Sequence, residues 1–130
     1  MDKKIISTAA ILGMIAIILG AFGAHALKKV MSIEQLSTFE TGVRYQMYHA
    51  LFLLFIGLMK DMSEKTKKTI YFLVLFGVLL FSGSIYLLAT NNLTSFDFKI
   101  IGFVTPIGGL LFILAWSILL LNIINKKSQN

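Results

Sequence analysis

Long apolar runs separated by short polar segments make up this chain. The first run, 5–24, holds twenty residues, and at about 1.5 Å per residue a helix of that length spans roughly 30 Å, the thickness of a bilayer core. Three further runs of comparable length follow. We therefore predict one all-α membrane domain over residues 1–130, a four-transmembrane-helix bundle. Its spans are predicted at approximately 5–27, 42–59, 69–90 and 100–124.

A capping motif precedes the second span. Ser32 is followed three residues later by Gln35, the spacing at which each side chain satisfies a backbone donor of the other residue. Apolar residues then recur at helical spacing over 36–43. This pattern predicts a short interfacial amphipathic helix before helix two, with Gly42 as the kink where the chain turns into the membrane.

The first run also has features of a signal peptide. Lys3 and Lys4 give it a positive start, and residues 24–26 read Ala-His-Ala, which is similar to a cleavage site. However, the run is longer than the roughly 7–15 apolar residues of a signal core, and further apolar runs follow it. These features favour an uncleaved first span.

Composition supports the membrane assignment. Hydrophobic residues make up 57% of the chain and charged residues 14%, against about a quarter charged in ordinary soluble proteins. The chain has no cysteine, which excludes disulfides and thiolate metal sites. Its net charge of +6 lies mostly in short lysine clusters between apolar runs. Anionic lipid headgroups are therefore expected as partners, with 60–68 as a solvated, headgroup-binding loop, and nucleic acid is not.

The basic residues also predict the orientation, because four spans place both termini on one side. The basic residues of that side are Lys3, Lys4, Lys60, Lys65, Lys67, Lys68, Lys126 and Lys127. Those of the opposite side are Lys28, Lys29, Arg44 and Lys99. The positive-inside rule therefore places both termini in the cytoplasm.

The stretch 39–54 concentrates polar chemistry at the start of the second span. It holds the only arginine and one of the two histidines of the chain. At 100° per residue, half of the helix circumference carries Glu40, Arg44, Tyr45, Tyr48 and His49. Gln46 falls outside that half. Such polarity within a membrane helix is costly, so these side chains should have partners.

The predicted topology brings further polar side chains to the same level as this stretch. The resulting cluster, in the outer half of the bundle, is His25, Glu40, Arg44, Tyr45, Gln46, His49, Ser82, Ser84, Tyr86 and Thr105. The inner half is expected to be almost purely aliphatic and aromatic, and Trp116 to face lipid or the core. The cluster is either a ligand site or a structural network.

Individual members of the cluster also carry alternatives. Glu40 and Arg44 are predicted to form an i, i+4 ion pair, or else Arg44 anchors an anionic headgroup or substrate. His25 and His49 either make structural hydrogen bonds or ligate haem or a metal, and His49 could relay protons. Small residues expected to pack helices closely are Ala16, Gly20, Ala24, Gly83, Gly108 and Gly109.

Several strings along the chain resemble a known family. They are GAFGAHALKK at 20–29, FETGVRYQMYHAL at 39–51, LFSGSIYLLA at 80–89 and TPIGG at 105–109, with Trp116 following. The chain resembles the YgdD/YwdK-like family of small bacterial membrane proteins, which has an animal transmembrane counterpart. The resemblance implies a four-helix protein of the bacterial cytoplasmic (inner) membrane without signal cleavage, and it implies no activity.

We weigh three functions from the sequence. The first is a non-catalytic structural, accessory or envelope component, because the chain has no phosphate loop, nucleophile elbow or metal-protease helix. The second is a small oligomeric transporter or channel that uses the polar cluster. The third is a bis-histidine haem or redox protein. We expect no enzyme, no cofactor and no metal, and a homo-oligomer or a membrane-protein partner remains open.

Overall fold

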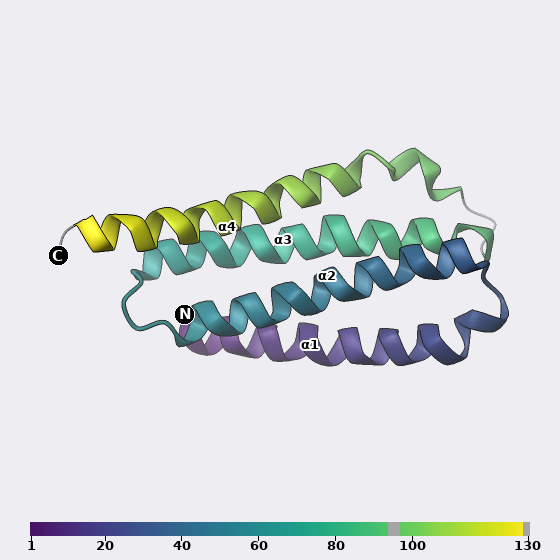
Figure 1. Cartoon of the computed structure of the whole chain (residues 1–130), viewed down its shortest axis with the longest axis horizontal. Helices are drawn as coiled ribbons and strands as arrows, with labels where there is room; N and C mark the ends of the chain where they lie inside the picture. The colour runs from purple at the N-terminus through teal and green to yellow at the C-terminus, as the bar shows by residue number, and fades with distance from the viewer. Residues whose placement is uncertain (94–96, 129–130) are drawn as a thin grey trace.

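The computed structural model describes residues 1–93 and 97–128, and this part of the chain is helical and antiparallel (Figure 1). Its long helices are α1 (Asp2–His25), α2 (Ile33–Leu58), α3 (Glu64–Ala89) and α4 (Val104–Ser128). Short 3-10 helices form at Leu27–Lys29, Asn91–Leu93 and Phe98–Ile101. The α1–α2 and α3–α4 connections lie at one end of the bundle, and the α2–α3 connection lies at the other. The predicted polar connection 91–99 falls partly outside the described residues.

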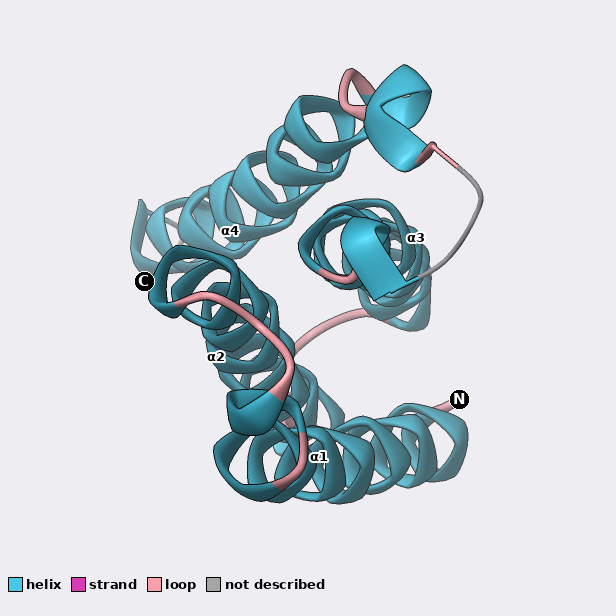
Figure 2. Ribbon diagram, turned by 90° about the vertical axis from the view of Figure 1, so that its right-hand side faces the viewer, coloured by secondary structure: helices cyan, strands magenta, loops and turns pink. Residues whose placement is uncertain are grey.

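The helices pack in chain order. α1 packs on α2, α2 on α3 and α3 on α4, and the end-on view shows α1 and α4 on opposite sides of the central pair (Figure 2). α2 and α3 therefore each have a helix on both sides. This central position is what allows the polar residues of α2 to find partners.

Three stretches of the described chain are long and apolar enough to cross a membrane, namely those that contain α1, α3 and α4. α2 is not among them, because its first half carries Arg44, Gln46 and His49 before the apolar residues 50–58. α2 is nevertheless as long as its neighbours, with 26 residues against 24 to 26. α2 is thus excluded from this group by its polar first half and not by its length.

The start of α2 confirms one prediction and corrects another. Ser32 accepts a bond from the Gln35 backbone at 3.1 Å, and the Gln35 side chain accepts from the Ser32 backbone at 3.0 Å, so the capping box is formed. The predicted separate interfacial helix is wrong, because α2 continues without a break from Ile33 through Gly42. Gly42 serves close packing instead of a kink.

Two apolar clusters lie above and below the polar cluster. The larger one fills the half of the bundle at the α2–α3 connection, which is the predicted inner half, and its fully buried members are Ile5, Leu53, Ile56, Ile70, Val74 and Ala115. The smaller one, at the opposite end, which is the predicted outer end, consists of Leu27, Met31, Phe39 and Ala89. The polar side chains of α2 and α3 are therefore enclosed between two apolar regions.

Candidate functional site

α2 and α3 are joined where Gly42 meets Tyr86. A Cβ atom at position 42 would lie 2.7 Å from Cε1 of Tyr86, so the missing side chain lets this ring lie against the α2 backbone. One turn earlier on α3, the buried Ser82 hydroxyl donates to the Gly42 carbonyl at 2.8 Å. Gly42 thus brings two hydroxyl groups of α3 against α2.

Gln46 connects three helices. The Tyr86 hydroxyl donates to its Oε1 at 2.7 Å, and its Nε2 donates to the Leu12 carbonyl of α1 at 2.9 Å. Because a carbonyl can only accept, the amide nitrogen must face α1 and the amide oxygen must face α3. Gln46 is only 3% exposed. Gln46, which lies outside the polar half of the helix circumference, therefore faces the other helices.

His49 is held as a neutral ring by two partners. Its Nδ1 lies 2.8 Å from the Tyr45 carbonyl, which only accepts, so Nδ1 carries the hydrogen. The indole nitrogen of Trp116 lies 3.1 Å from Nε2 and only donates, so Nε2 is the acceptor. Phe112 stacks on the imidazole with ring centroids 3.6 Å apart. Both ring nitrogens are engaged, which disfavours a metal, haem or proton-relay role.

A pair of hydroxyl groups joins α3 to α4. The oxygens of Ser84 and Thr105 lie 2.5 Å apart, and the Ser84 hydroxyl also donates to the Phe81 carbonyl at 3.0 Å. Since serine has one hydroxyl hydrogen, Thr105 is the donor between the two side chains. The predicted cluster residues that bond across helices are Gln46, His49, Ser82, Ser84, Tyr86 and Thr105.

The remaining predicted residues do not join this network. His25, Glu40 and Arg44 are exposed, and Tyr45 is 38% exposed beside Phe81. The predicted ion pair is not formed, because the Arg44 guanidinium donates to the Thr41 hydroxyl at 3.0 Å instead. An exposed ion pair is only slightly more favourable than two separately hydrated charges. The Arg44 guanidinium can therefore bond to the Thr41 hydroxyl instead of Glu40.

The two histidines lie at different levels of the bundle. Gly13 of α1 packs near Ala50, whereas Gly23 packs on Phe39. At about 1.5 Å per residue, this register puts His25 roughly 17 Å further along the bundle than His49. The two imidazoles therefore do not form the predicted bis-histidine site.

Some of the predicted packing residues occupy close helix contacts. Ala16 is 1% exposed, whereas a Cβ atom at Gly20 would lie 3.5 Å from Val43, which is an ordinary contact. Gly108 makes the closest approach, since a Cβ atom there would lie 2.4 Å from the backbone nitrogen of Phe81. The α3 and α4 backbones thus meet directly at Gly108.

Other predicted packing residues have more room. A Cβ atom at Gly109 would lie 3.7 Å from the nearest neighbour, which is an ordinary contact. At Gly83 the nearest atom would be 3.9 Å away, and Ala24 is exposed. Small residues are common in membrane helices, and these three positions do not require one.

A buried charge lies at the inner end, which corrects the prediction of an almost purely apolar inner half. Lys67 is 2% exposed, and its ammonium donates to Asp2 Oδ1 at 2.9 Å and to the Met59 carbonyl. It also corrects the predicted loop 60–68, because α3 begins at Glu64 and includes Lys67. The bond from Thr8 to Tyr71, with oxygens 3.0 Å apart, adds a second polar contact in that half.

Some of the buried polar positions can be recognised from the helical pattern of the sequence. Lys67 continues the buried stripe of Ile70 and Val74 one turn towards the start of α3. Gln46 and His49, which were predicted members of the polar cluster, likewise fall in the stripe of buried α2 positions. Polar residues at apolar positions of a helical pattern mark buried partners. Trp116 had no such signal, because its position on α4 is half-exposed.

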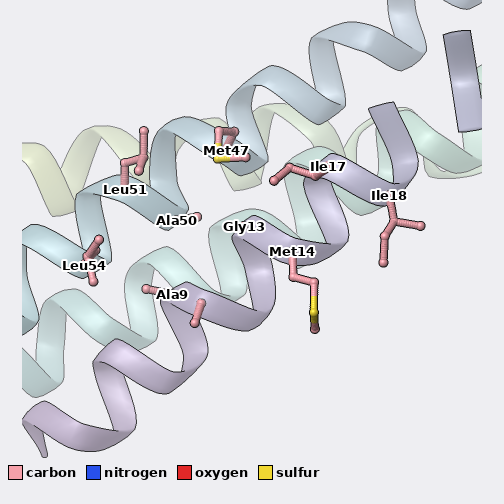
Figure 3. Close-up of a pocket in the computed structure, with 10 residues that line it drawn as sticks. Ala9, Gly13, Met14, Ile17, Ile18, Met47, Ala50, Leu51 and Leu54 are labelled. Carbon is pink, nitrogen blue, oxygen red and sulfur yellow. The ribbon is translucent and has the colours of Figure 1, made fainter. Parts of the chain in front are cut away.

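Four surface grooves of the described chain are lined by residues outside the network. The groove between α1 and α2 has a volume of about 470 Å³ (Figure 3). Small residues Ala9, Gly13 and Ala50 lie between the two helices, and Met47 and Leu51 border them on α2. Its lining is apolar, so it offers no recognition chemistry beyond contact with hydrocarbon.

Comparisons with known proteins agree with the membrane architecture. A family described as "Protein of unknown function (DUF423)" matches residues 19–109. A UPF0382 membrane protein of Staphylococcus saprophyticus is 41% identical over 119 residues, 92% of this chain and 95% of that protein. The UPF0382 inner membrane protein YgdD of Escherichia coli K12 is 39% identical over 124 residues, 93% of this chain and 89% of that protein. No solved structure matches the chain.

Proposed function

We propose that this chain, which belongs to the DUF423 family of membrane proteins, is a non-catalytic structural or accessory component of the bacterial cytoplasmic membrane. The observation that carries this proposal is the bonding of the buried polar side chains. Gln46, His49 and Tyr86 direct their polar atoms to neighbouring helices. A ligand site needs polar groups directed into a cavity. These groups instead fix the positions of the four helices.

We further propose that α2 crosses the membrane together with the other helices. Its support is the position of α2 between α1 and α3, antiparallel to both and of similar length. The polar side chains that lower its hydropathy are partly compensated, because Gln46 and His49 bond within the bundle. Arg44 is exposed near the middle of α2 and bonds to the Thr41 hydroxyl one turn towards the helix start, the direction in which a long side chain extends towards the headgroups.

The proposed orientation places both termini in the cytoplasm. The end of the bundle with the α2–α3 connection carries exposed lysines from three segments, namely Lys3, Lys60 and Lys65. Basic residues are enriched on the cytoplasmic side of membrane proteins. The lysine distribution therefore favours this end as cytoplasmic.

Two single-cysteine variants test the crossing of α2 and the orientation. Because the chain has no cysteine, Ser37→Cys and Lys60→Cys each give one labelling site, near opposite ends of α2. In intact cells a membrane-impermeant maleimide should label Cys at 37 and should label Cys at 60 only after permeabilisation. Labelling of both from one side would contradict the crossing of α2, and the reverse pattern would contradict the orientation.

A flux measurement tests the structural role. Gln46→Leu and His49→Phe should lower the stability of the purified protein and leave solute flux in liposomes at the level of protein-free vesicles. Transport is disfavoured because fully buried Leu53, Ile56 and Val74 close the bundle below the cluster. Flux through the wild-type protein that changes in a stably folded variant would overturn the structural role.

A further inference from the structure

A basic hollow lies at the end of the bundle where α1 and α3 begin. It has a volume of about 710 Å³, and its basic side chains are Lys4, Lys65 and Lys68. Its carboxylate, Glu64, lies 3.8 Å from the amino group of Met1, which offsets its charge. The dipoles of two helix starts add to the positive potential. The hollow therefore favours an anion.

Aromatic rings hold one of these cations in place. The Lys4 ammonium lies 5.7 Å from the ring centroid of Tyr71 and 6.0 Å from that of Phe72. The two rings pack edge to face with centroids 5.1 Å apart. A cation over an aromatic face is attracted to it, so Lys4 is positioned before a ligand arrives. The cost of ordering this side chain on binding is reduced.

An apolar groove lies on the other side of Phe72, between α3 and α4, whereas the hollow lies between α1 and α3. The groove has a volume of about 390 Å³ and is lined by Thr69, Phe72, Leu73, Phe76, Leu80 and Leu111. Phe72 lines both the groove and the basic hollow. The two hollows are therefore neighbours, one basic and one made of hydrocarbon.

The order of these residues along α3 matches the two parts of a phospholipid. Lys65, Lys68, Phe72 and Phe76 follow one another at steps of three or four residues, so they lie on one face of the helix. Phe76 lies about 12 Å deeper than Lys68 at 1.5 Å per residue. One leaflet of a bilayer core is about 15 Å thick. A headgroup beside the lysines would thus place an acyl chain beside the aromatic rings.

We propose that the basic hollow and this groove bind one anionic phospholipid from the leaflet at the α2–α3 end of the bundle. Its phosphate lies among Lys4, Lys65 and Lys68. One acyl chain lies against Phe72 and Phe76. Lysine ammonium groups bind phosphate as point charges, and the aromatic face supplies the apolar contact. This site goes beyond the structural role, because it assigns a defined lipid to defined residues.

Native mass spectrometry of the full-length protein in detergent tests the site. Phosphatidylglycerol and phosphatidylcholine with identical acyl chains are titrated separately, and the wild-type protein should bind phosphatidylglycerol more tightly. Lys65→Gln/Lys68→Gln should weaken phosphatidylglycerol binding by about fivefold per lysine removed and leave phosphatidylcholine binding unchanged. The matched control, Lys3→Gln/Lys60→Gln, removes the same charge from exposed residues outside the hollow and should change binding less than twofold.

Two further measurements distinguish a bound lipid from a bound soluble anion. Phe72→Ala should weaken phosphatidylglycerol binding, whereas Phe55→Ala, on the exposed face of α2, should not. Millimolar inorganic phosphate or glycerol phosphate should not displace the lipid. Equal losses in both lysine double variants would show diffuse attraction and overturn the site. Displacement by inorganic phosphate without an effect of Phe72→Ala would show a soluble-anion site and overturn it as well.

Discussion

The outer and inner halves of the bundle are held together by different chemistry. The outer half uses neutral hydrogen bonds between helices, from Tyr86 to Gln46 and from Thr105 to Ser84. The inner end uses ion pairs, of which that between Lys67 and Asp2 is the most buried. Neutral groups lose less hydration on burial than charged ones do. The buried charge of Lys67 therefore lies at the end of the bundle, where its partner Asp2 remains half-exposed.

The closest backbone contact of the outer half gives the largest expected effect. Gly108→Ala places a Cβ atom against the backbone of Phe81, so α3 and α4 must separate and the nearby Thr105–Ser84 bond is strained. We expect a loss of about 3 kcal/mol in the free energy of unfolding, measured in mixed detergent–SDS micelles. Gly109→Ala is the matched control, with room for its methyl group. Equal losses in both variants would contradict the close contact.

Removal of the partner of the buried lysine should have the next largest effect. Asp2→Asn leaves the Lys67 ammonium with the Met59 carbonyl and no counter-charge. Because Asp2 is half-exposed, we expect a loss of about 2 kcal/mol, below the value for a fully buried pair. The same unfolding assay measures it. Asp61→Asn, which removes an exposed pair with Lys126, is the control, and a loss as large as that of Asp2→Asn would contradict the distinction.

The connection through Gln46 can be measured by a double-mutant cycle. Gln46→Leu removes its bonds to Tyr86 and Leu12, with an expected loss of about 1.5 kcal/mol. Tyr86→Phe removes the bond that the two side chains share and leaves the bond from Gln46 to Leu12 in place. A coupling energy of about 0.6 kcal/mol or more is expected from the cycle. Strictly additive losses would show that this bond does not stabilise the fold.

The bond between Trp116 and His49 should contribute less. Trp116→Phe removes the indole donor and retains an aromatic ring, so we expect a loss of about 0.6 kcal/mol. The chain has a single tryptophan, so its fluorescence reports the same contact. His49→Phe should shift the emission maximum of Trp116, whereas replacement of the exposed His25 by Phe should not. An unchanged emission in His49→Phe would argue against the bond.

The smallest effect is expected at the exposed ion pair of the inner end. Lys126 lies 3.1 Å from Asp61, and both side chains are substantially exposed. Lys126→Gln should change the free energy of unfolding by less than about 0.5 kcal/mol in the same assay. A loss of stability comparable to that of Asp2→Asn would show that burial does not determine how much each ion pair contributes.

Helix number, order and approximate position could be predicted from the sequence, because apolar runs of bilayer length leave few alternatives. The capping box at Ser32 was also predictable, since it depends only on neighbouring residues. The continuity of α2 through Gly42 was not, because a glycine gives the same local signal for a kink and for a close contact. Only the Tyr86 ring, some forty residues away in the chain, distinguishes the two.

The membership of the polar cluster was predicted in part for a similar reason. The positions of Gln46 and Ser82 along their helices predicted their heights along the bundle axis, and therefore that they could lie close together. Position along a helix did not give direction, and Arg44 and Glu40 point away from the bundle although they share that level. The helical stripe of Ile70 and Val74 indicates that Lys67 is buried, but its counter-charge could not be predicted, since Asp2 lies on another helix.

The polarity of α2 bears on how the polypeptide enters the bilayer during synthesis. A segment with Arg44, Gln46 and His49 in its first half partitions weakly into lipid on its own. The Leu12 carbonyl of α1 is already present when this segment is made, whereas Tyr86 emerges from the ribosome later. In the proposed topology, α2 therefore enters alongside α1 and is secured only when α3 arrives. The order of translation thereby becomes part of the assembly pathway.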